Sequence, residues 1–170
     1  MLISIKSWLD LLQEWPSSIA IRESIYGYTA LLSLHVLSMC LFFGLVLMMD
    51  LRLMGVGNMR TPFSQLQRRL FPWQMFGMVV SAVTGVMLIY GQPSRFYSNI
   101  FFYVKMMMML AASVNALAFH QSEYHTVSLW DAGGPPPGNA KVSGVLSIAL
   151  WAGVVVAGRL IAYNWFALRR

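Results

Sequence analysis

A few ionisable side chains lie inside long apolar stretches of this sequence, and their chemistry makes them the first candidates for a site. His35 lies in an apolar run that begins at Ile25, and Lys105 and His120 share another run. Ionisable groups are costly to place in hydrocarbon, so such positions are functional candidates. An imidazole nitrogen binds a metal ion or a haem iron, or carries a proton.

The spacing of these residues predicts that the two histidines share a depth in the membrane. At a rise of about 1.5 Å per residue, His35 lies about 20 Å beyond Arg22, and His120 lies about 22 Å beyond Lys105. If the first and third helices face each other across a bundle, the two imidazoles can be the axial ligands of haem b. Lys105 and Arg159 then lie near the amino-terminal face, placed to pair with the haem propionates.

Two polar residues lie one turn from the histidines. Ser38 follows His35 and Glu123 follows His120, so each is spaced to orient an imidazole or relay a proton. In the alternative interpretation the histidines only pack, with Ser38 accepting the proton of His35. His125 points about 140° away from His120 on an ideal helix, and its role stays open.

Methionine offers a second kind of site. The chain has 13 methionines, including the run Met106 to Met109, and thioether sulfurs bind Cu(I). Four consecutive residues point all round a helix, so copper handling is one alternative and apolar filling is the other. Cys40 stands alone, and no paired nucleophile, phosphate loop, CxxC or HExxH motif is present. The sequence therefore gives no support to a hydrolase.

The composition predicts the elements that must position these residues. The chain has 170 residues, of which 58% are hydrophobic and 11% charged, and its mean hydropathy is +0.61. This composition predicts an all-α integral membrane four-helix bundle. The net charge of +6 resides mainly between the apolar runs. Such charges are typical of membrane-edge anchors and not of a nucleic-acid surface.

Two units are expected along the chain. Residues 1–16 form an amphipathic interfacial helix that Pro16 ends, and residues 17–170 form a single four-helix transmembrane domain. The four spans are expected at about residues 25–49, 73–90, 100–120 and 142–166. The connections are expected as a separate amphipathic segment at 63–71, a turn at 91–99, a third helix that continues toward Trp130, and a non-helical loop at 131–141.

Gly77, Ser81 and Gly85 recur every four residues in the second span. Three small side chains therefore share one helix face, where a neighbouring helix or a flat ligand can approach closely. Helix packing is the commoner meaning of this pattern.

The even number of spans predicts that both termini lie on one side of the membrane, which we expect to be a bacterial inner membrane. The basic residues of the two faces are balanced in number. Four arginines concentrated between the first and second spans, Arg52, Arg60, Arg68 and Arg69, favour a cytoplasmic position for that loop. The termini are then expected on the periplasmic side.

The run from Leu34 to Met54, LHVLSMCLFFGLVLMMDLRLM, together with Lys105 before His120, resembles a superfamily of small bacterial membrane proteins. This superfamily includes HemJ-type protoporphyrinogen oxidases and the membrane domain of CopD copper proteins. The resemblance implies haem b bound through His35, with Lys105 matching a basic residue needed for activity. The residues Asp50 to Arg52 depart from the proline and arginine pattern of that superfamily.

Over nearly its whole length, the chain more closely resembles an uncharacterised bacterial four-span family with no assigned activity. Its members begin with segments like Trp8–Leu9 and Ile21–Ser24. The leading hypothesis is a haem b protein that works in electron transfer or as a membrane oxidoreductase, with a quinone or a protein as redox partner. One alternative is the handling of copper or a small solute, and another is a structural subunit of a membrane complex or a homo-oligomer.

Overall fold

The computed structural model describes residues 5–57, 60–122, 127–131 and 134–163. Their regular structure is helical, in the order α1 (Ile5–Gln13), α2 (Pro16–Glu23), α3 (Ile25–Met54), α4 (Phe63–Gly91), α5 (Pro93–Tyr97), α6 (Ile100–Ser122), α7 (Val127–Trp130) and α8 (Gly138–Ile161). The helices α3, α4, α6 and α8 are each long and apolar enough to cross a membrane. The expected all-α membrane bundle is confirmed.

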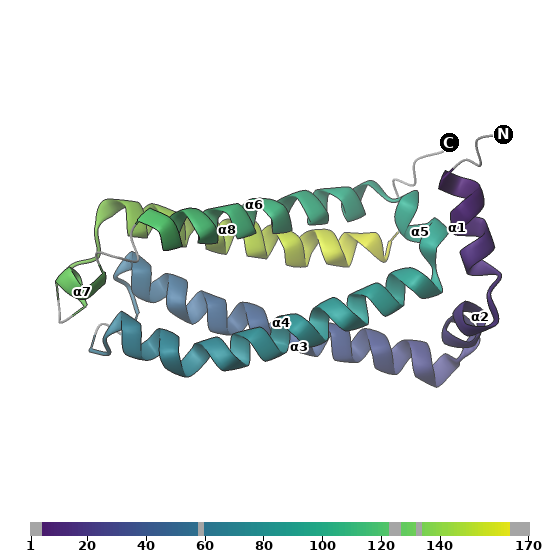
Figure 1. Ribbon diagram of the computed structural model, residues 1–170, viewed down its shortest axis with the longest axis horizontal. Coiled ribbons are helices and arrows are strands. Elements are labelled where there is room, and N and C mark those ends of the chain that lie inside the picture. The colour runs from purple at the N-terminus through teal and green to yellow at the C-terminus, as the bar shows by residue number, and fades with distance from the viewer. Residues whose placement is uncertain (1–4, 58–59, 123–126, 132–133, 164–170) are drawn as a thin grey trace.

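The four long helices run side by side along the long axis of the molecule (Figure 1). We call the end that holds α1, α2 and α5 the terminal end, and the end that holds α7 the loop end. Helix α3 packs against α4 and α8, and α8 also packs against α6. The backbone of α6 lies close to that of α8 and not to those of α3 and α4, although Phe119 of α6 meets Phe63 of α4 at the loop end. The bundle therefore consists of two helix pairs joined through α3 and α8.

Two glycines let the neighbouring helices approach α3 closely. A Cβ atom on Gly77 of α4 would lie 3.1 Å from the Ser38 carbonyl oxygen of α3, and one on Gly144 of α8 would lie 3.0 Å from the Asp50 carbonyl oxygen. Small residues at such positions permit the tight packing that holds membrane helices together. The helix-packing interpretation of Gly77 is thus the correct one.

The loop end is held by a buried aromatic cluster. Phe63 and Trp130 lie with their ring centroids 5.8 Å apart, and Phe119 meets Phe63 edge to face at 6.1 Å. Arg52 has no exposed surface, and its Nε donates a hydrogen bond to the Thr61 carbonyl oxygen at 3.0 Å. These contacts tie the α3–α4 connection and α7 to the ends of the long helices.

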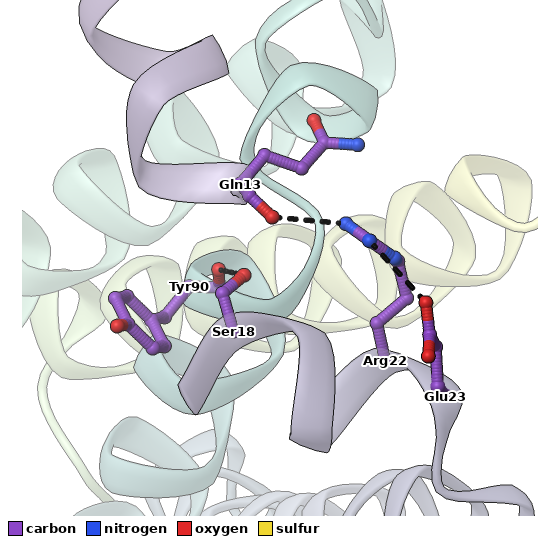
Figure 2. A network of polar contacts seen from close by, with 5 residues as sticks. All are labelled: Gln13, Ser18, Arg22, Glu23 and Tyr90. Carbon is purple, nitrogen blue, oxygen red and sulfur yellow. Dashed lines mark hydrogen bonds and ion pairs between the residues drawn. The ribbon is translucent and has the colours of Figure 1, made fainter. Parts of the chain in front are cut away.

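The terminal end is held by hydrogen bonds from α2. The Ser18 hydroxyl donates to the Tyr90 carbonyl oxygen of α4 at 2.9 Å. The Arg22 guanidinium donates to the Gln13 carbonyl oxygen at 3.2 Å and lies 3.8 Å from the Glu23 carboxylate. Figure 2 shows this network, in which α2 links α1 to the end of α4.

Helix α1 lies across the bundle end in Figure 1. Trp8 and Leu11 are 57% and 50% exposed, and their spacing of three residues places them on one face of α1. The Ser94 hydroxyl donates a hydrogen bond to the Asp10 carboxylate at 3.0 Å, which ties α1 to α5. An apolar stripe on a helix that crosses the bundle end fits the expected interfacial position.

Several expected boundaries were wrong. Residues 63–71 do not form a separate segment, because α4 runs without interruption through Pro72. Proline removes one backbone donor, and membrane helices tolerate this loss where nearby groups satisfy the free carbonyl. The expected turn at 91–99 contains α5, which begins at Pro93 because the ring of proline suits the first turn of a helix.

The fourth span differs from expectation, whereas the expected continuation of the third helix toward Trp130 is not tested. Helix α6 is described as far as Ser122 and α7 covers Val127–Trp130, so that continuation depends on the residues between them. Residues 123–126 lie outside the described part. Helix α8 begins at Gly138, directly after the proline run, and ends at Ile161, so both its ends precede those expected. The loop after α7 therefore ends at Pro137 and not at Lys141.

Candidate functional site

His35 lies in the first half of α3, with its ring directed at α4. Its Nδ1 lies 2.9 Å from the Ser81 carbonyl oxygen and 3.0 Å from the Thr84 hydroxyl oxygen. Thr84 is buried and its own hydroxyl donates to the Val80 carbonyl oxygen at 2.7 Å. Two oxygens of α4 therefore face one nitrogen of the His35 ring.

These partners fix the tautomer of a neutral His35. A carbonyl oxygen only accepts hydrogen bonds, so Nδ1 must carry the proton that is donated to Ser81. The Thr84 hydroxyl donates its hydrogen bond to the Val80 carbonyl oxygen, so its oxygen can accept from Nδ1. The proton on Nδ1 leaves the lone pair of Nε2 available. Histidines that bind metals usually show this arrangement, with the second nitrogen donating to a carbonyl or carboxylate.

Gly85 makes room for the imidazole against α4. A Cβ atom at this position would lie 3.0 Å from Cε1 of His35 and 3.5 Å from Nδ1. Any larger residue at position 85 must push the ring away from its hydrogen-bond acceptors. The stripe of Gly77, Ser81 and Gly85 thus contacts α3 and positions His35.

Lys105 is a cation of α6 whose charge acts on this histidine. It is partly buried. The lysine side chain passes over Gly158 of α8, where an added Cβ would lie 3.6 Å from Nζ. Among the described residues, Lys105 has no hydrogen-bond or ion-pair partner.

The structure does not bring His120 to His35. His35 is ten residues after the first residue of α3, and His120 is twenty residues after the first residue of α6. Both helices begin at the terminal end (Figure 1), so the two lie about 15 Å and about 30 Å along their helices. His120 is also exposed. The expected equal depth was measured from Arg22 and Lys105, whereas the helices begin at Ile25 and Ile100.

Arg159 points away from the bundle interior. It is exposed, its Nη2 lies 3.5 Å from the Tyr163 hydroxyl oxygen, and its Cζ lies 5.4 Å from the centroid of that ring. The preceding residue, Gly158, is the one that faces Lys105. Lys105 and Arg159 therefore lie near the same end of the bundle but on different surfaces of it.

The expected neighbours of the histidines have other positions. The Ser38 hydroxyl donates to the main-chain carbonyl oxygen of His35 at 3.0 Å and not to the ring. Glu123 and His125 lie outside the described residues. The sequence reasoning missed Thr84, and it noted Ser81 only as a small residue. Their spacing of three residues on α4 was the signal that could have identified both as acceptors facing one helix.

The methionine run has no common direction. Met106 and Met107 are exposed at 46% and 64%, whereas Met108 packs against Gly153 of α8. Within the described part of the chain, no group of three His, Cys, Asp or Glu residues is placed to hold a metal ion. Cys40 is exposed. His35 and Lys105 therefore remain the candidate site residues that the structure places in the interior of the bundle.

Comparisons with known proteins place the chain among proteins without an assigned activity. No curated protein and no solved structure matches the sequence significantly. The profile of a family described as a family of unknown function (DUF6644) matches residues 20–164. The matched segment begins in α2 and includes all four long helices, with His35 and Lys105 among them. The chain therefore belongs to the DUF6644 family.

Proposed function

We propose that this protein binds haem b within the membrane through His35 and works in electron transfer or as a membrane oxidoreductase. The hydrogen bond from Nδ1 of His35 to the Ser81 carbonyl oxygen carries the proposal. A histidine held in this way presents Nε2 as a ligand, and imidazole is the commonest protein ligand of haem b. The resemblance of Leu34 to Met54 to the HemJ and CopD superfamily supports the same residue.

The surroundings of His35 fit such a group. Helix α6 packs mainly on α8, and His35 is only partly buried between α3 and α4. Lys105 supplies a positive charge near the ring. A partly buried cation without an acidic partner among the described residues suits a ligand that carries carboxylates.

The residues around His35 would have different roles in binding haem. His35 would bind the iron, while Ser81 and Thr84 would hold the imidazole orientation and strengthen its basicity through Nδ1. Lys105 would pair with a propionate. Bound haem would supply one-electron redox chemistry. A membrane quinone or a protein is the proposed redox partner.

The paired-histidine form of the hypothesis is not retained, because His120 lies at a different depth and is exposed. Haem content separates the two histidines. We expect the protein purified in detergent after haem-supplemented expression to give a haem b spectrum in the pyridine haemochrome assay. His35→Ala should lose most of this haem, and His120→Ala should retain it. Lys105→Gln should bind less haem than the wild type.

The control is the amount of folded protein. Each variant is compared at equal concentration after size-exclusion chromatography, with helical content measured by circular dichroism. A wild type that stays colourless, or a His35→Ala variant that keeps a full complement of haem, would overturn the proposal.

Two alternatives predict different results for the same preparations. A copper-handling protein would carry copper in elemental analysis and bind no haem, with its sites drawn from the methionines. A structural subunit would carry neither, and would co-purify with partner chains or as a larger homo-oligomer. The hydrogen bond from His35 to the Ser81 carbonyl oxygen does not favour copper handling or a structural role over haem binding.

We further propose that the protein resides in a bacterial inner membrane, with the loop end cytoplasmic and the terminal end periplasmic. The exposed basic residues Arg60, Arg68, Arg69 and Lys141 at the loop end support this orientation. Helix α1 and the end of α8 lie at the same end of the bundle (Figure 1), which supports a common side for the termini.

A further inference from the structure

Exposed arginines at the start of α4 have no partner among the described residues. Arg60, Arg68 and Arg69 are all exposed, and none makes a hydrogen bond or an ion pair through its side chain. The nearby Asp131 carboxylate accepts hydrogen bonds from the Ser64 backbone and hydroxyl. The positive charge of this surface is therefore not neutralised by the described part of the chain.

Arginines at the terminal end differ in this respect. Arg22 contacts Gln13 and Glu23. Arg95 donates to the Gln92 side chain at 3.0 Å and to the Ala162 carbonyl oxygen at 3.2 Å. Arg159 lies over Tyr163. Among the described residues, the arginines of the terminal end therefore contact other parts of the chain, whereas Arg68 and Arg69 of α4 are available to an external anion.

An aromatic surface follows Arg69 on the same side of α4. Trp73 and Phe76 are exposed at 60% and 58%, and their rings meet edge to face with centroids 6.4 Å apart. Trp73 is four residues after Arg69, so the two side chains lie on adjacent turns of one helix face. Cations beside an aromatic belt are characteristic of the boundary between head groups and hydrocarbon.

We infer that Arg68, Arg69, Trp73 and Phe76 form a binding site for an anionic phospholipid. The guanidinium groups would hold the phosphate through charge-assisted hydrogen bonds, and the two rings would lie along the glycerol and the upper acyl chains. Charge complementarity selects this occupant, because a zwitterionic lipid offers the arginines no net charge. The site is independent of any haem at His35, which lies in α3.

Fluorescence quenching of Trp73 tests the site in the full-length protein. The protein is placed in nanodiscs that contain either brominated phosphatidylglycerol or brominated phosphatidylcholine. The contribution of Trp73 is obtained by subtracting the signal of Trp73→Phe. We expect Trp73 to be quenched more strongly by the brominated anionic lipid. Removing one arginine should lower the apparent affinity for that lipid about fivefold.

Matched variants separate a site from general surface charge. Arg69→Gln and Lys141→Gln each remove one exposed cation from the loop end, but Lys141 belongs to α8. Arg69→Gln should lose much of the preference and Arg68→Gln/Arg69→Gln nearly all of it, with Lys141→Gln close to the wild type. Equal quenching by the two lipids, a preference that survives the double substitution, or an equal loss in Lys141→Gln would overturn the inference.

Discussion

At the scale of single residues, the site depends on how α4 holds one imidazole. His35 is partly buried, and its Nδ1 has two oxygens of α4 within 3.0 Å. Buried polar groups are stable only when they are hydrogen-bonded. A histidine used only for packing satisfies the same rule, so the choice between packing and ligation rests on what Nε2 binds.

Gly85 is the residue on which this arrangement most clearly depends. We expect Gly85→Val to displace the His35 ring, because a Cβ alone would lie 3.0 Å from Cε1. Overpacking of this kind lowers the free energy of unfolding by about 1–3 kcal/mol. If His35 binds haem, Gly85→Val should also contain less haem than the wild type. Thermal unfolding in detergent and the pyridine haemochrome assay measure the two effects.

Gly44 provides the control, since a Cβ there would have no atom within 4 Å. Gly44→Val should change the free energy of unfolding by less than about 0.5 kcal/mol. Equal effects of the two substitutions would contradict the assigned role of Gly85.

At the scale of helices, α6 is attached to the bundle mainly through α8. The Asn115 side-chain amide donates to the Ser143 carbonyl oxygen at 3.0 Å, and the Ser143 hydroxyl donates to the Asn115 side-chain oxygen at 3.2 Å. Polar contacts of this kind join membrane helices across their interface. This pair therefore contributes to the position of α6, and so to that of Lys105.

A double-mutant cycle measures the contribution. We expect Asn115→Ala and Ser143→Ala to show a coupling energy of about 0.6 kcal/mol in unfolding, because similar contacts in membrane bundles average near this value. The amide-to-carbonyl bond survives in Ser143→Ala, so only the hydroxyl bond is tested. Ser113 bonds only within its own helix, to the Met109 carbonyl oxygen. A cycle of Asn115→Ala with Ser113→Ala should therefore give a coupling near zero, and equal values in both cycles would contradict the role of the pair.

The long apolar helices were predictable from the sequence, because uninterrupted hydrophobic runs have one stable solution in a bilayer. The first and last residues of these helices were less predictable. Pro72 was expected to begin a helix, yet it lies inside α4, since the sequence does not show whether a free carbonyl finds another partner. The short helix α5 was missed because its five residues give too little periodicity.

The candidate site was predictable in part. His35 and Lys105 were identified because each is an ionisable group in an apolar run, and the structure places both toward the bundle. The match of His120 to His35 failed because a few residues of error in the helix starts moves a side chain by several Ångström. The acceptors Ser81 and Thr84 depend on how α4 packs on α3, which the sequence of α4 alone does not determine.

At the scale of the whole molecule, the two ends of the bundle differ in whether their described basic side chains contact other residues or are exposed. The described arginines of the terminal end make contacts within the chain, as Arg52 does at the loop end, whereas Arg60, Arg68, Arg69 and Lys141 are exposed. Exposed basic residues near the ends of spans determine orientation during insertion. This difference, taken over the described residues, supports the proposed cytoplasmic position of the loop end.

The orientation leads to a prediction for reporter fusions. Alkaline phosphatase fused after Arg170 should be active, because the proposed terminal end lies in the periplasm, and green fluorescent protein at the same position should stay dark. The same reporters inserted in the loop after α7 should give the opposite pattern. Replacing Arg60, Arg68 and Arg69 with Gln should weaken the bias. A fluorescent fusion at the carboxyl terminus would contradict the proposed orientation.

The central claim is that His35 is the ligand of a haem b iron. Its most direct test is rescue of His35→Gly by free imidazole, which can occupy the space that the side chain leaves. The account predicts that the purified variant lacks the haem spectrum and regains it when haem and imidazole are added together, but not with haem alone. A variant that binds haem equally well without imidazole, or that never regains the spectrum although it remains folded, would contradict the claim.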